Sequence, residues 1–498
     1  SAIRIRSRSA FGDAIGTRDW EPTAGGESGH IVARPDNPDV VYGGSYGGFL
    51  IRYDHSNGDV RAINVWPDNP MGWGAAELKY RFNWNFPILV SPHDPDTLYA
   101  AANVLFKTTD EGQTWQAISG DLTRNLKEKQ GTSGGPITKD NTSVEYYGTI
   151  FAVAESPLEA GVIWTGSDDG LVHVSRDGGQ NWQDVTPKAR NSSLPTEIQI
   201  NSIEAHPFEA GGLYLAATAY KSDDFRPYLF KTTDYGKSWV KITDGIPADH
   251  FTRVIRADTE QAGLLFAGTE SGIYLSKDDG KSWQSTQLNL PVVPITDLAV
   301  KEGNLVAATQ GRGYWILDDV SILRQANESV FKQSQHLFTP APVWRLRNGS
   351  DENPENMGSN PPAGVPLHYW LAEELPADSD VSLEILDKDG GVIRTFTPKP
   401  VDEKDKETPV LGDDDRKLET KAGLNVFVWD LRYPSVERFK DLVLWNDALK
   451  GPRAVPGEYE ATLRIGETKQ TVSFEVLADP RLNVTAADYQ AQYDFISG

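Results

Sequence analysis

Three carboxylates occur in two short, similar phrases that begin and end with glycine, where they could act as acid and base. Asp168 and Asp169 occur in GSDDG, and Glu270 occurs in GTESG. Two carboxylates that flank a glycosidic bond can protonate the leaving oxygen and activate a water molecule. A carboxylate followed by glycine is also a good turn former, so a structural role in a turn is the competing interpretation.

Arginine and tyrosine residues offer a second kind of chemistry. Arg81 and Arg253 stand where predicted strands begin, and guanidinium groups there can clamp a ligand carboxylate. Glu145 and Tyr146 are adjacent, so a tyrosine nucleophile could have a carboxylate base beside it. Further ligand-binding candidates from the same class of loops are aromatic or charged: Trp73, Trp84, Lys139, Asp140 and Arg312. Aromatic rings suit sugar stacking, but they can equally pack between strands.

The elements that would position these residues follow from one repeated phrase. It reads TTDEGQTW at 108–115, SRDGGQNW at 175–182, TTDYGKSW at 232–239 and SKDDGKSW at 276–283. The aspartate can accept backbone N–H groups in a hairpin turn, the glycine tolerates positive φ, and the tryptophan buries a large ring on the returning strand. The aligned aspartates and tryptophans are Asp110, Asp177, Asp234, Asp278, Trp115, Trp182, Trp239 and Trp283.

Each copy of the phrase lies within a recurring unit of short strands. The clearest unit runs TIFAVAESP, GVIWTG and GLVHVS, followed by the phrase and a fourth strand. Six such units, the last one shortened, occupy residues 28–320. Four short strands per repeat without helical periodicity predict an all-β β-propeller of four-stranded blades. Six blades could close a ring, and a larger ring completed by another segment or another chain is the alternative.

The phrase resembles the Asp-box (BNR) repeat of sialidases, xyloglucanases and propellers of the sortilin/Vps10 type. The resemblance covers about residues 28–320 and is specific for architecture. It implies that the boxes are structural turns and that ligands bind on the opposite face, where the candidate residues above would lie. Sialidases place arginines at similar positions, but their Arg-Ile-Pro signature is absent here. Bacterial proteins of this type are often called glycosyl hydrolases.

The segments outside residues 28–320 differ from the repeats in composition and residue pattern. Residues 1–27 have no clear assignment, 321–366 are expected to form a linker, and 481–498 begin a helix. Alternating strands in 367–480 predict a β-sandwich that resembles the immunoglobulin-like domains of many secreted bacterial enzymes. The acidic stretch 402–417 is expected to be a solvated loop, with a Ca²⁺ site at Asp413, Asp414 and Asp415 as the alternative.

Composition excludes several classes of function. A formal net charge of −23 argues against nucleic-acid binding, and the chain has no apolar run long enough to span a membrane. Without cysteine there are no disulfides and no thiolate chemistry. The scattered histidines predict no metal site, and no phosphate-binding or dinucleotide motif occurs, so no cofactor is expected.

Three functions remain open. The first is an extracytoplasmic (secreted or periplasmic) propeller that binds a polysaccharide, oligosaccharide or peptide. The second is a glycoside hydrolase, of xyloglucanase or sialidase type, that uses carboxylates on the same face. The third is a scaffold subunit that mainly contacts other proteins. Carboxylates about 5–10 Å apart across an open cleft would favour the hydrolase, and a plugged centre with an exposed apolar side would favour the scaffold.

Overall fold

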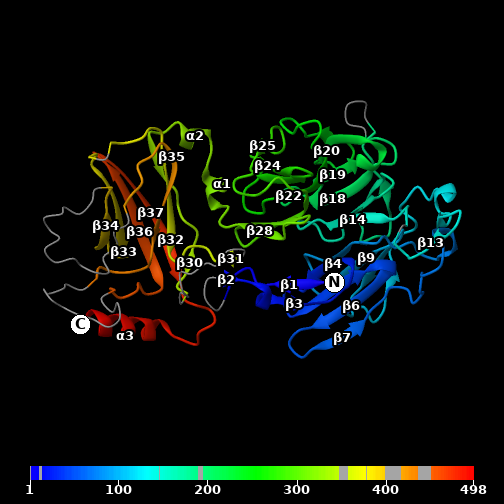
Figure 1. The fold of residues 1–498 in the computed structure, drawn as a ribbon, viewed down its shortest axis with the longest axis horizontal. Coiled ribbons are helices and arrows are strands. Elements are labelled where there is room, and N and C mark those ends of the chain that lie inside the picture. The colour runs from blue at the N-terminus through cyan, green and yellow to red at the C-terminus, as the bar shows by residue number, and fades with distance from the viewer. Residues whose placement is uncertain are drawn as a thin grey trace. The chain divides into compact units, whose positions relative to one another are not determined.

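The computed structural model describes residues 2–9, 14–144, 146–188, 194–346, 357–376, 378–398, 417–435 and 450–498. It divides the chain into two compact units. Unit 1 comprises Ser1–Ser7 and Thr17–Leu317, and unit 2 comprises Arg8–Gly16 and Asp318–Gly498. Both units are built mainly from antiparallel sheets (Figure 1). Among the described residues, no helix is long and apolar enough to cross a membrane.

Unit 1 is a β-propeller of six successive sheets, which we call blades 1 to 6. Blade 1 contains β4 (Ser28–Ala33), β5 (Val40–Ser45), β6 (Phe49–Asp54) and β7 (Asp59–Ala62). Blade 2 contains β8 (Ile88–Val90), β9 (Leu98–Ala101), β10 (Leu105–Thr108) and β11 (Gln116–Ala117). Blade 3 contains β14 (Ile150–Glu155), β15 (Ile163–Ser167), β16 (Val172–Ser175) and β17 (Gln183–Asp184).

The other three blades repeat this order, and the last is shorter. Blade 4 contains β18 (Gln199–Ala205), β19 (Leu213–Ala219), β20 (Asp224–Thr232) and β21 (Val240–Lys241). Blade 5 contains β22 (Thr252–Ala257), β23 (Leu265–Thr269), β24 (Gly272–Ser276) and β25 (Gln284–Ser285). Blade 6 contains β26 (Ile295–Lys301), β27 (Asn304–Thr309) and β28 (Tyr314–Leu317), and its sheet has three strands in the described part of the chain.

Short elements lie before the first blade, between blades and within hairpins. Two small sheets pair β1 (Ile3–Ile5) with β3 (Trp20–Pro22), and β12 (Ser133–Gly134) with β13 (Lys139–Asp140). The short 3-10 turns are η1 (Thr17–Asp19), η2 (Tyr46–Gly48), η3 (Ala75–Glu77), η4 (Lys127–Lys129) and η5 (Tyr220–Ser222). The segment 1–27, left unassigned from the sequence, therefore supplies β1 and β3 to unit 1.

Neighbouring blades pack face to face. Every residue of β9, β15, β19 and β23 is buried. These second strands read as unbroken runs of small and apolar residues because a blade covers each face of their sheet. Separate buried clusters join blades 1 and 2, 2 and 3, 3 and 4, and 4 and 5. The hydrophobic core of the propeller is therefore a series of layers between sheets.

The four copies of the repeated phrase form closely similar turns, here called the repeat turns: Thr108–Trp115, Ser175–Trp182, Thr232–Trp239 and Ser276–Trp283. In the first, Asp110 accepts the Thr108 hydroxyl at 2.7 Å and the Thr114 backbone N–H at 2.9 Å. Hydrogen bonds from Thr114, and then from Thr108, lower the pKa of Asp110 to about 2. The other three aspartates accept the equivalent hydrogen bonds. The aspartate thus stabilises the turn itself.

The tryptophan and glycine of each repeat turn contact the preceding blade. The Trp239 indole N–H donates to the Val185 carbonyl at 2.7 Å. A Cβ atom added at Gly236 would lie 2.6 Å from the Val185 Cβ. The same two contacts join Trp115 and Gly112 to Ile63, Trp182 and Gly179 to Ile118, and Trp283 and Gly280 to Ile242. Each repeat turn therefore fixes one blade against the blade before it.

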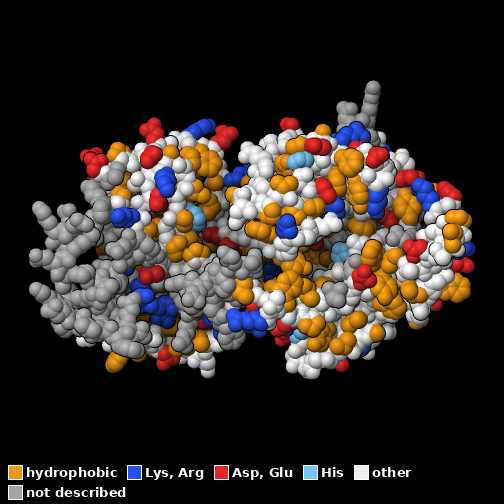
Figure 2. All heavy atoms as spheres, in the orientation of Figure 1, with side chains coloured by type: hydrophobic (Ala, Val, Ile, Leu, Met, Phe, Trp, Pro, Cys, Tyr) orange, Lys and Arg blue, Asp and Glu red, His pale blue; other side chains and the backbone are white. Residues whose placement is uncertain are grey.

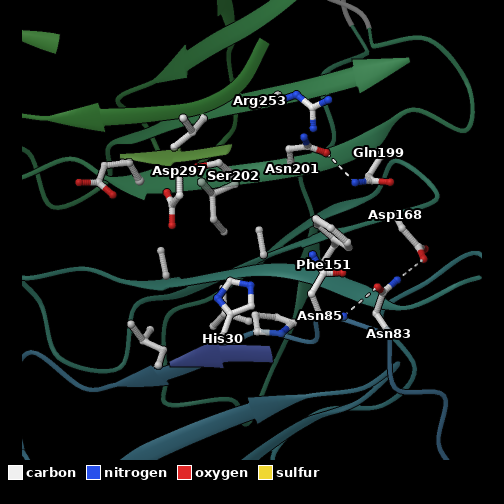
Figure 3. Close-up of a pocket in the computed structure, with 18 of the residues that line it drawn as sticks. His30, Asn83, Asn85, Phe151, Asp168, Gln199, Asn201, Ser202, Arg253 and Asp297 are labelled. Carbon is white, nitrogen blue, oxygen red and sulfur yellow. Dashed lines mark hydrogen bonds between the residues drawn. The ribbon is translucent and has the colours of Figure 1, made fainter. Parts of the chain in front are cut away.

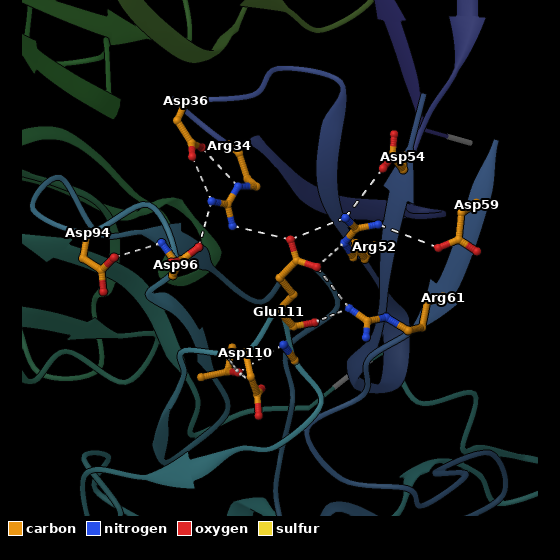
Figure 4. Close-up of polar contacts among 12 residues, drawn as sticks. Arg34, Asp36, Arg52, Asp54, Asp59, Arg61, Asp94, Asp96, Asp110 and Glu111 are labelled. Carbon is orange, nitrogen blue, oxygen red and sulfur yellow. Dashed lines mark hydrogen bonds and ion pairs between the residues drawn. The ribbon is translucent and has the colours of Figure 1, made fainter. Parts of the chain in front are cut away.

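The residue after the aspartate adds a polar contact to the preceding blade. Glu111, at φ 55°, makes ion pairs with Arg34, Arg52 and Arg61 of blade 1 (Figure 4). In the fourth turn, Asp279 accepts the Tyr214 hydroxyl at 2.6 Å and makes an ion pair with Lys231. In the third, the Tyr235 hydroxyl donates to Glu159 at 2.7 Å. This position is thus used three times to connect neighbouring blades.

Unit 2 contains two sheets around one core. The first sheet is β29 (Gln335–Leu337), β32 (Val365–Leu371) and β35 (Gly423–Trp429). The second is β30 (Val343–Trp344), β37 (Thr468–Leu477), β36 (Gly457–Ile465), β33 (Val381–Asp387) and β34 (Val392–Phe396). Leu367, Tyr369 and Trp429 from the first sheet and Leu383 and Phe474 from the second belong to one buried cluster. The alternating burial along β32 is what a two-sheet core requires.

The remaining elements of unit 2 are α1 (Ser321–Gln325), α2 (Glu328–Phe331), α3 (Ala486–Ser497) and a small sheet of β2 (Ala14–Ile15) with β31 (Gly358–Ser359). Residues 321–366, expected to be a linker, thus contain two short helices and strands β29, β30 and β31. The Asp413–Asp415 stretch lies outside the described residues.

We expect Gly236→Ala to destabilise the propeller more than Gly58→Ala does. Both glycines have φ near 80°, at 77° and 80°, so each substitution has the left-handed backbone cost of about 1–2 kcal/mol. Only at Gly236 does the new methyl group meet the preceding blade, because nothing lies within 4 Å of a Cβ at Gly58. Overpacking there should cost a further 1–3 kcal/mol or so. Chemical denaturation of the two variants measures the difference, and equal losses would contradict the role of the glycine between blades.

Candidate ligand-binding cavity

A cavity of about 1500 Å³ is lined by the first strand of every blade: β4, β8, β14, β18, β22 and β26. We call the end at which these strands begin the upper end, and the end at which they finish the lower end. Because the strands of a blade are antiparallel, the hairpins between second and third strands lie on the upper side, and the repeat turns lie on the lower side. No residue of the four repeat turns is among the described residues that line the cavity. The centre of the propeller is thus open.

A β-bulge interrupts the first strand of five blades at the same place. The pairing register shifts at Phe151 in blade 3, Asn201 in blade 4, Arg253 in blade 5 and Thr296 in blade 6, and between Ser28 and Ile31 in blade 1. Phe151, Asn201, Arg253, Thr296 and, in blade 1, His30 all line the cavity. Bulges re-aim side chains and are common beside functional sites.

Amide side chains gather at the upper end. Asn83 and Asn85 precede β8, and Gln199 and Asn201 begin β18 (Figure 3). The Gln199 amide donates to Asn201 Oδ1 at 2.7 Å. The Asn83 amide donates to Thr149 Oγ1 at 3.0 Å. Since an amide both donates and accepts, this wall can match a ligand that has many hydroxyl groups.

Asp168 lies against this wall and is almost fully buried. Its Oδ1 accepts the backbone N–H groups of Gly148 at 3.0 Å and Thr149 at 2.9 Å, and its Oδ2 accepts the Thr149 hydroxyl at 2.8 Å. The Asn83 amide donates to Oδ2 at 3.3 Å. Burial raises the pKa of Asp168 to about 7 although these donors favour the charged form. The carboxyl group can therefore hold or release a proton near neutral pH.

Three buried polar atoms of the cavity wall lack a hydrogen-bond partner in the described part of the chain. They are the indole N–H of Trp84, the hydroxyl of Thr218 and Oε2 of Glu155. Thr218, at 3% exposure, pairs with Gln199 across the β18–β19 ladder. A buried polar group without a partner costs free energy, so such atoms are expected where a ligand or ordered water completes the site.

Charged groups occupy the middle and lower part. Arg256 donates to Asp297 Oδ1 and to Ser202 Oγ, each at 2.7 Å, and its Nη1 lies 3.6 Å from Glu204 Oε2. Burial raises the pKa of Glu204, while the charge of Arg256 opposes this shift. Burial also lowers the pKa of His30, and Asp297 opposes that shift. Figure 3 shows Asp297 toward the end of the cavity opposite Asp168.

The other predicted catalytic carboxylates, Asp169 and Glu270, already have partners within the protein. Asp169 is fully buried and accepts the Ser167 hydroxyl at 2.5 Å and the Arg124 backbone N–H at 2.8 Å. Glu270 makes an ion pair with Arg253 at 2.6 Å.

Tyr146 lines the cavity, but its hydroxyl donates to the carbonyls of Pro70 at 3.2 Å and Trp73 at 3.0 Å. Burial raises the pKa of Tyr146 to about 12. Glu145, its predicted carboxylate base, lies outside the described residues.

The predicted ligand-binding residues divide into two groups. Trp84 and Arg253 line the cavity. Arg81 is buried and donates to Asp121 at 2.8 Å and to the Gly148 carbonyl at 3.0 Å, which ties the 120–148 loop to blade 2. The others lie at exposed positions outside the cavity lining: Trp73, Lys139, Asp140 and Arg312.

Several cavity residues were not predicted from the sequence. They are His30, Asn83, Phe151, Asn201, Glu204, Arg256, Thr296 and Asp297. Their shared signal is a position within a first strand or, for Asn83, in the loop that precedes one. In the described residues no group of three or more His, Asp or Glu side chains is placed to hold a metal ion.

Comparison with known proteins gives partial similarities. No family model matches the chain. Over 237 residues it is 24% identical to an oligoxyloglucan-reducing end-specific xyloglucanase of Emericella nidulans, a match that covers 44% of this chain and 24% of the relative. A probable enzyme of the same name from Neosartorya fischeri matches to the same extent. The chain thus spans about a quarter of the length of these relatives.

Solved structures with partial likeness include an ancestral GH74 enzyme, with a TM-score of 0.36, 17% identity and coverage of 67% of this chain and 39% of that one. YCF48 bound to D1 peptide gives a TM-score of 0.38 and 10% identity, with coverage of 61% and 82%. GH74 of Niastella koreensis gives 0.35 and 12%, with coverage of 74% and 59%. The β-propeller fold of unit 1 is established by its six successive antiparallel sheets.

We expect Asp168 to make the stability of the propeller fall as pH rises from about 4 to about 7. Its folded pKa of about 7 lies above the ordinary value of 3.8, so the folded chain holds a proton that the unfolded chain has lost. The free energy of unfolding then decreases by about 1.4 kcal/mol per pH unit in this range. The Asp168→Asn protein should lack this part of the pH dependence of its free energy of unfolding. Denaturation of both proteins at pH 5 and 6.5 measures it, and parallel pH profiles would contradict the shift.

Proposed function

We propose that unit 1 binds an uncharged oligosaccharide or polysaccharide chain in its central cavity, on the side opposite the repeat turns. The observation that carries the proposal is the upper wall of Asn83, Asn85, Gln199 and Asn201, with the unpartnered polar atoms of Trp84 and Thr218 beside it. Sugars present alternating donors and acceptors on an apolar ring. Amides and aromatic rings are the side chains that match both features.

The charges of the cavity also favour an uncharged ligand. Five carboxylates line it in the described structure, and each already accepts a hydrogen bond or ion pair: Glu155, Asp168, Glu197, Glu204 and Asp297. Arg256 and Arg253 are likewise paired with carboxylates. On the face shown in Figure 2, Lys and Arg side chains are interspersed with Asp and Glu. A strongly charged ligand would have to displace these pairs.

The names of the curated relatives support a glycan ligand. Those enzymes are described as acting on the reducing end of oligoxyloglucan. Since large polysaccharides do not cross membranes, we place the protein outside the cytoplasm, either secreted or periplasmic. A peptide ligand is the alternative for the same amide wall, because a peptide backbone also both donates and accepts.

We expect the purified chain to bind neutral oligosaccharides and Asn201→Ala to weaken that binding by roughly tenfold. The reason is that Asn201 offers hydrogen bonds worth about 0.5–1.5 kcal/mol each, and its loss also releases Gln199. A glycan array with xyloglucan, mannan and sialylated probes, followed by calorimetry, measures the affinity. Asp140→Ala, at an exposed position outside the cavity lining, is the matched control. Binding to peptides alone would contradict the glycan assignment.

A second candidate function is hydrolysis of the bound glycan. The specific observation in its favour is that Arg256 holds Glu204 and Asp297 in the same cavity but in different environments. Glu204, whose pKa is raised by burial, suits a general acid. Asp297 has a side chain that is 55% exposed and suits a base or nucleophile. Asp168, Asp169 and Glu270 remain the carboxylates predicted for this role from their sequence context.

If the chain hydrolyses glycans, we expect Glu204→Gln to reduce the release of reducing ends by at least about a hundredfold while binding is retained. Glutamine keeps the size of the side chain but cannot donate the proton. Asp168→Asn and Glu270→Gln, assayed in parallel on xyloglucan, test the carboxylates predicted from the sequence. Loss of activity only in those variants would assign the acid to the upper side, and no release by the wild-type chain would exclude hydrolysis of this substrate.

A further inference from the structure

An aromatic cluster stands beside the upper end of the cavity. The β19–β20 hairpin of blade 4 carries Tyr220 and Phe225, and both rings contact Phe251, which precedes β22 of blade 5. The rings of Tyr220 and Phe251 are stacked, with centroids 5.0 Å apart and an interplanar angle of 20°. Phe225 lies 6.1 Å from Phe251 at 50°. The buried Phe251 thus supports two rings on the hairpin.

The hairpin is held in one conformation by polar contacts. The Asp224 carboxylate accepts the Arg226 guanidinium at 2.8 and 2.7 Å and the Tyr228 hydroxyl at 2.6 Å. These donors lower the pKa of Asp224, the Arg226 side chain having the largest effect. Asp223 completes the turn at φ 60°. Phe225 is therefore carried on a hairpin that its own polar contacts stabilise, and such preorganisation reduces the conformational entropy lost when a ligand contacts it.

The cluster is continuous with the cavity. Tyr220, Lys221 and Arg253 line the cavity wall. The Arg253 guanidinium lies 5.2 Å from the Phe251 ring centroid and 5.8 Å from that of Tyr220, and Glu270 pairs with it. Lys221 donates to Gln199, a member of the amide wall, at 3.0 Å. The hairpin and the amide wall thus form one surface.

Phe225 is 46% exposed, with one side of its ring against Phe251. An exposed ring on a fixed hairpin, beside a wall of amides, has the features of a platform on which a sugar ring can stack. We propose that Phe225, supported by Phe251 and Tyr220, is a binding subsite for a sugar unit of the same chain whose other units occupy the cavity. This inference rests on the proposed glycan-binding function.

The proposal specifies the class of ligand more closely. A ligand that occupies the cavity and also reaches the hairpin must continue beyond the upper end. The protein should therefore prefer long oligosaccharides or polymers over short ones. The preference should depend on Phe225, whereas binding of short ligands should depend on the amide wall.

The test is a calorimetric comparison of a short and a long xyloglucan oligosaccharide, one repeating unit and two, with the full chain. We expect the wild type to bind the longer ligand more tightly than the shorter one. Phe225→Ala should weaken binding of the longer ligand by about three- to tenfold, which is the contribution of one aromatic contact. Binding of the shorter ligand should not change. Phe225→Leu, which keeps apolar bulk without the ring, should behave like the alanine variant.

Phe208→Ala is the matched control, because Phe208 is 41% exposed and follows β18 on the lower side of the same blade. Unchanged length dependence in Phe225→Ala, or an equal effect of Phe208→Ala, would overturn the subsite. Wild-type protein that binds neither oligosaccharide would instead refute the proposed function for this ligand class, and the subsite with it. Thermal unfolding of each variant shows whether the fold is retained.

Discussion

The propeller depends on a pair of contacts that is repeated four times. In each, a tryptophan N–H donates to one residue of the preceding blade, and a glycine packs against the side chain of that same residue. In the third repeat turn both contacts fall on Val185, whose carbonyl accepts the Trp239 N–H and whose side chain lies against Gly236. A larger residue than glycine would separate the sheets, and without the hydrogen bond the buried indole N–H would be unsatisfied. The repeated phrase therefore sets both the turn and the spacing of blades.

Fixed spacing between blades makes the cavity possible. Because the sheets are held from the lower side and through their apolar faces, the first strands need not fill the centre. Five of them bulge at the same position, and their side chains line an open space. The contacts between blades and the proposed binding site thus lie on opposite sides, and the loops of the upper side can vary without disturbing the contacts between blades.

Within the cavity, the contacts that side chains make with one another determine which groups remain available to bind a ligand. Arg256, Glu204 and Asp297 satisfy one another, and Asp168 is surrounded by donors. The amides, Trp84 and Thr218 keep hydrogen-bonding capacity that the described structure does not use in full. Phe225 extends this surface outward from a hairpin fixed by Asp224. This combination is the basis on which we propose a long, uncharged, hydroxyl-rich ligand.

The sequence by itself determined the local features. Asp110, Gly112 and Trp115 occur at fixed offsets, and a hairpin turn is a short-range structure, so the turns and the all-β propeller could be predicted from them. The site could be predicted only in part. Arg253 and Trp84 were identified as candidates and line the cavity, whereas Arg81, chosen on the same grounds, is occupied by Asp121 and the Gly148 carbonyl.

Only the tertiary structure decided which side chains face the centre. A bulge shifts the register of one strand against its neighbour, and this shift turns residues such as Asn201 and Phe151 toward the cavity. The grouping of Glu204, Arg256 and Asp297 likewise comes from three different blades. Such contacts depend on how distant segments pack, and therefore no local pattern in the chain could reveal them.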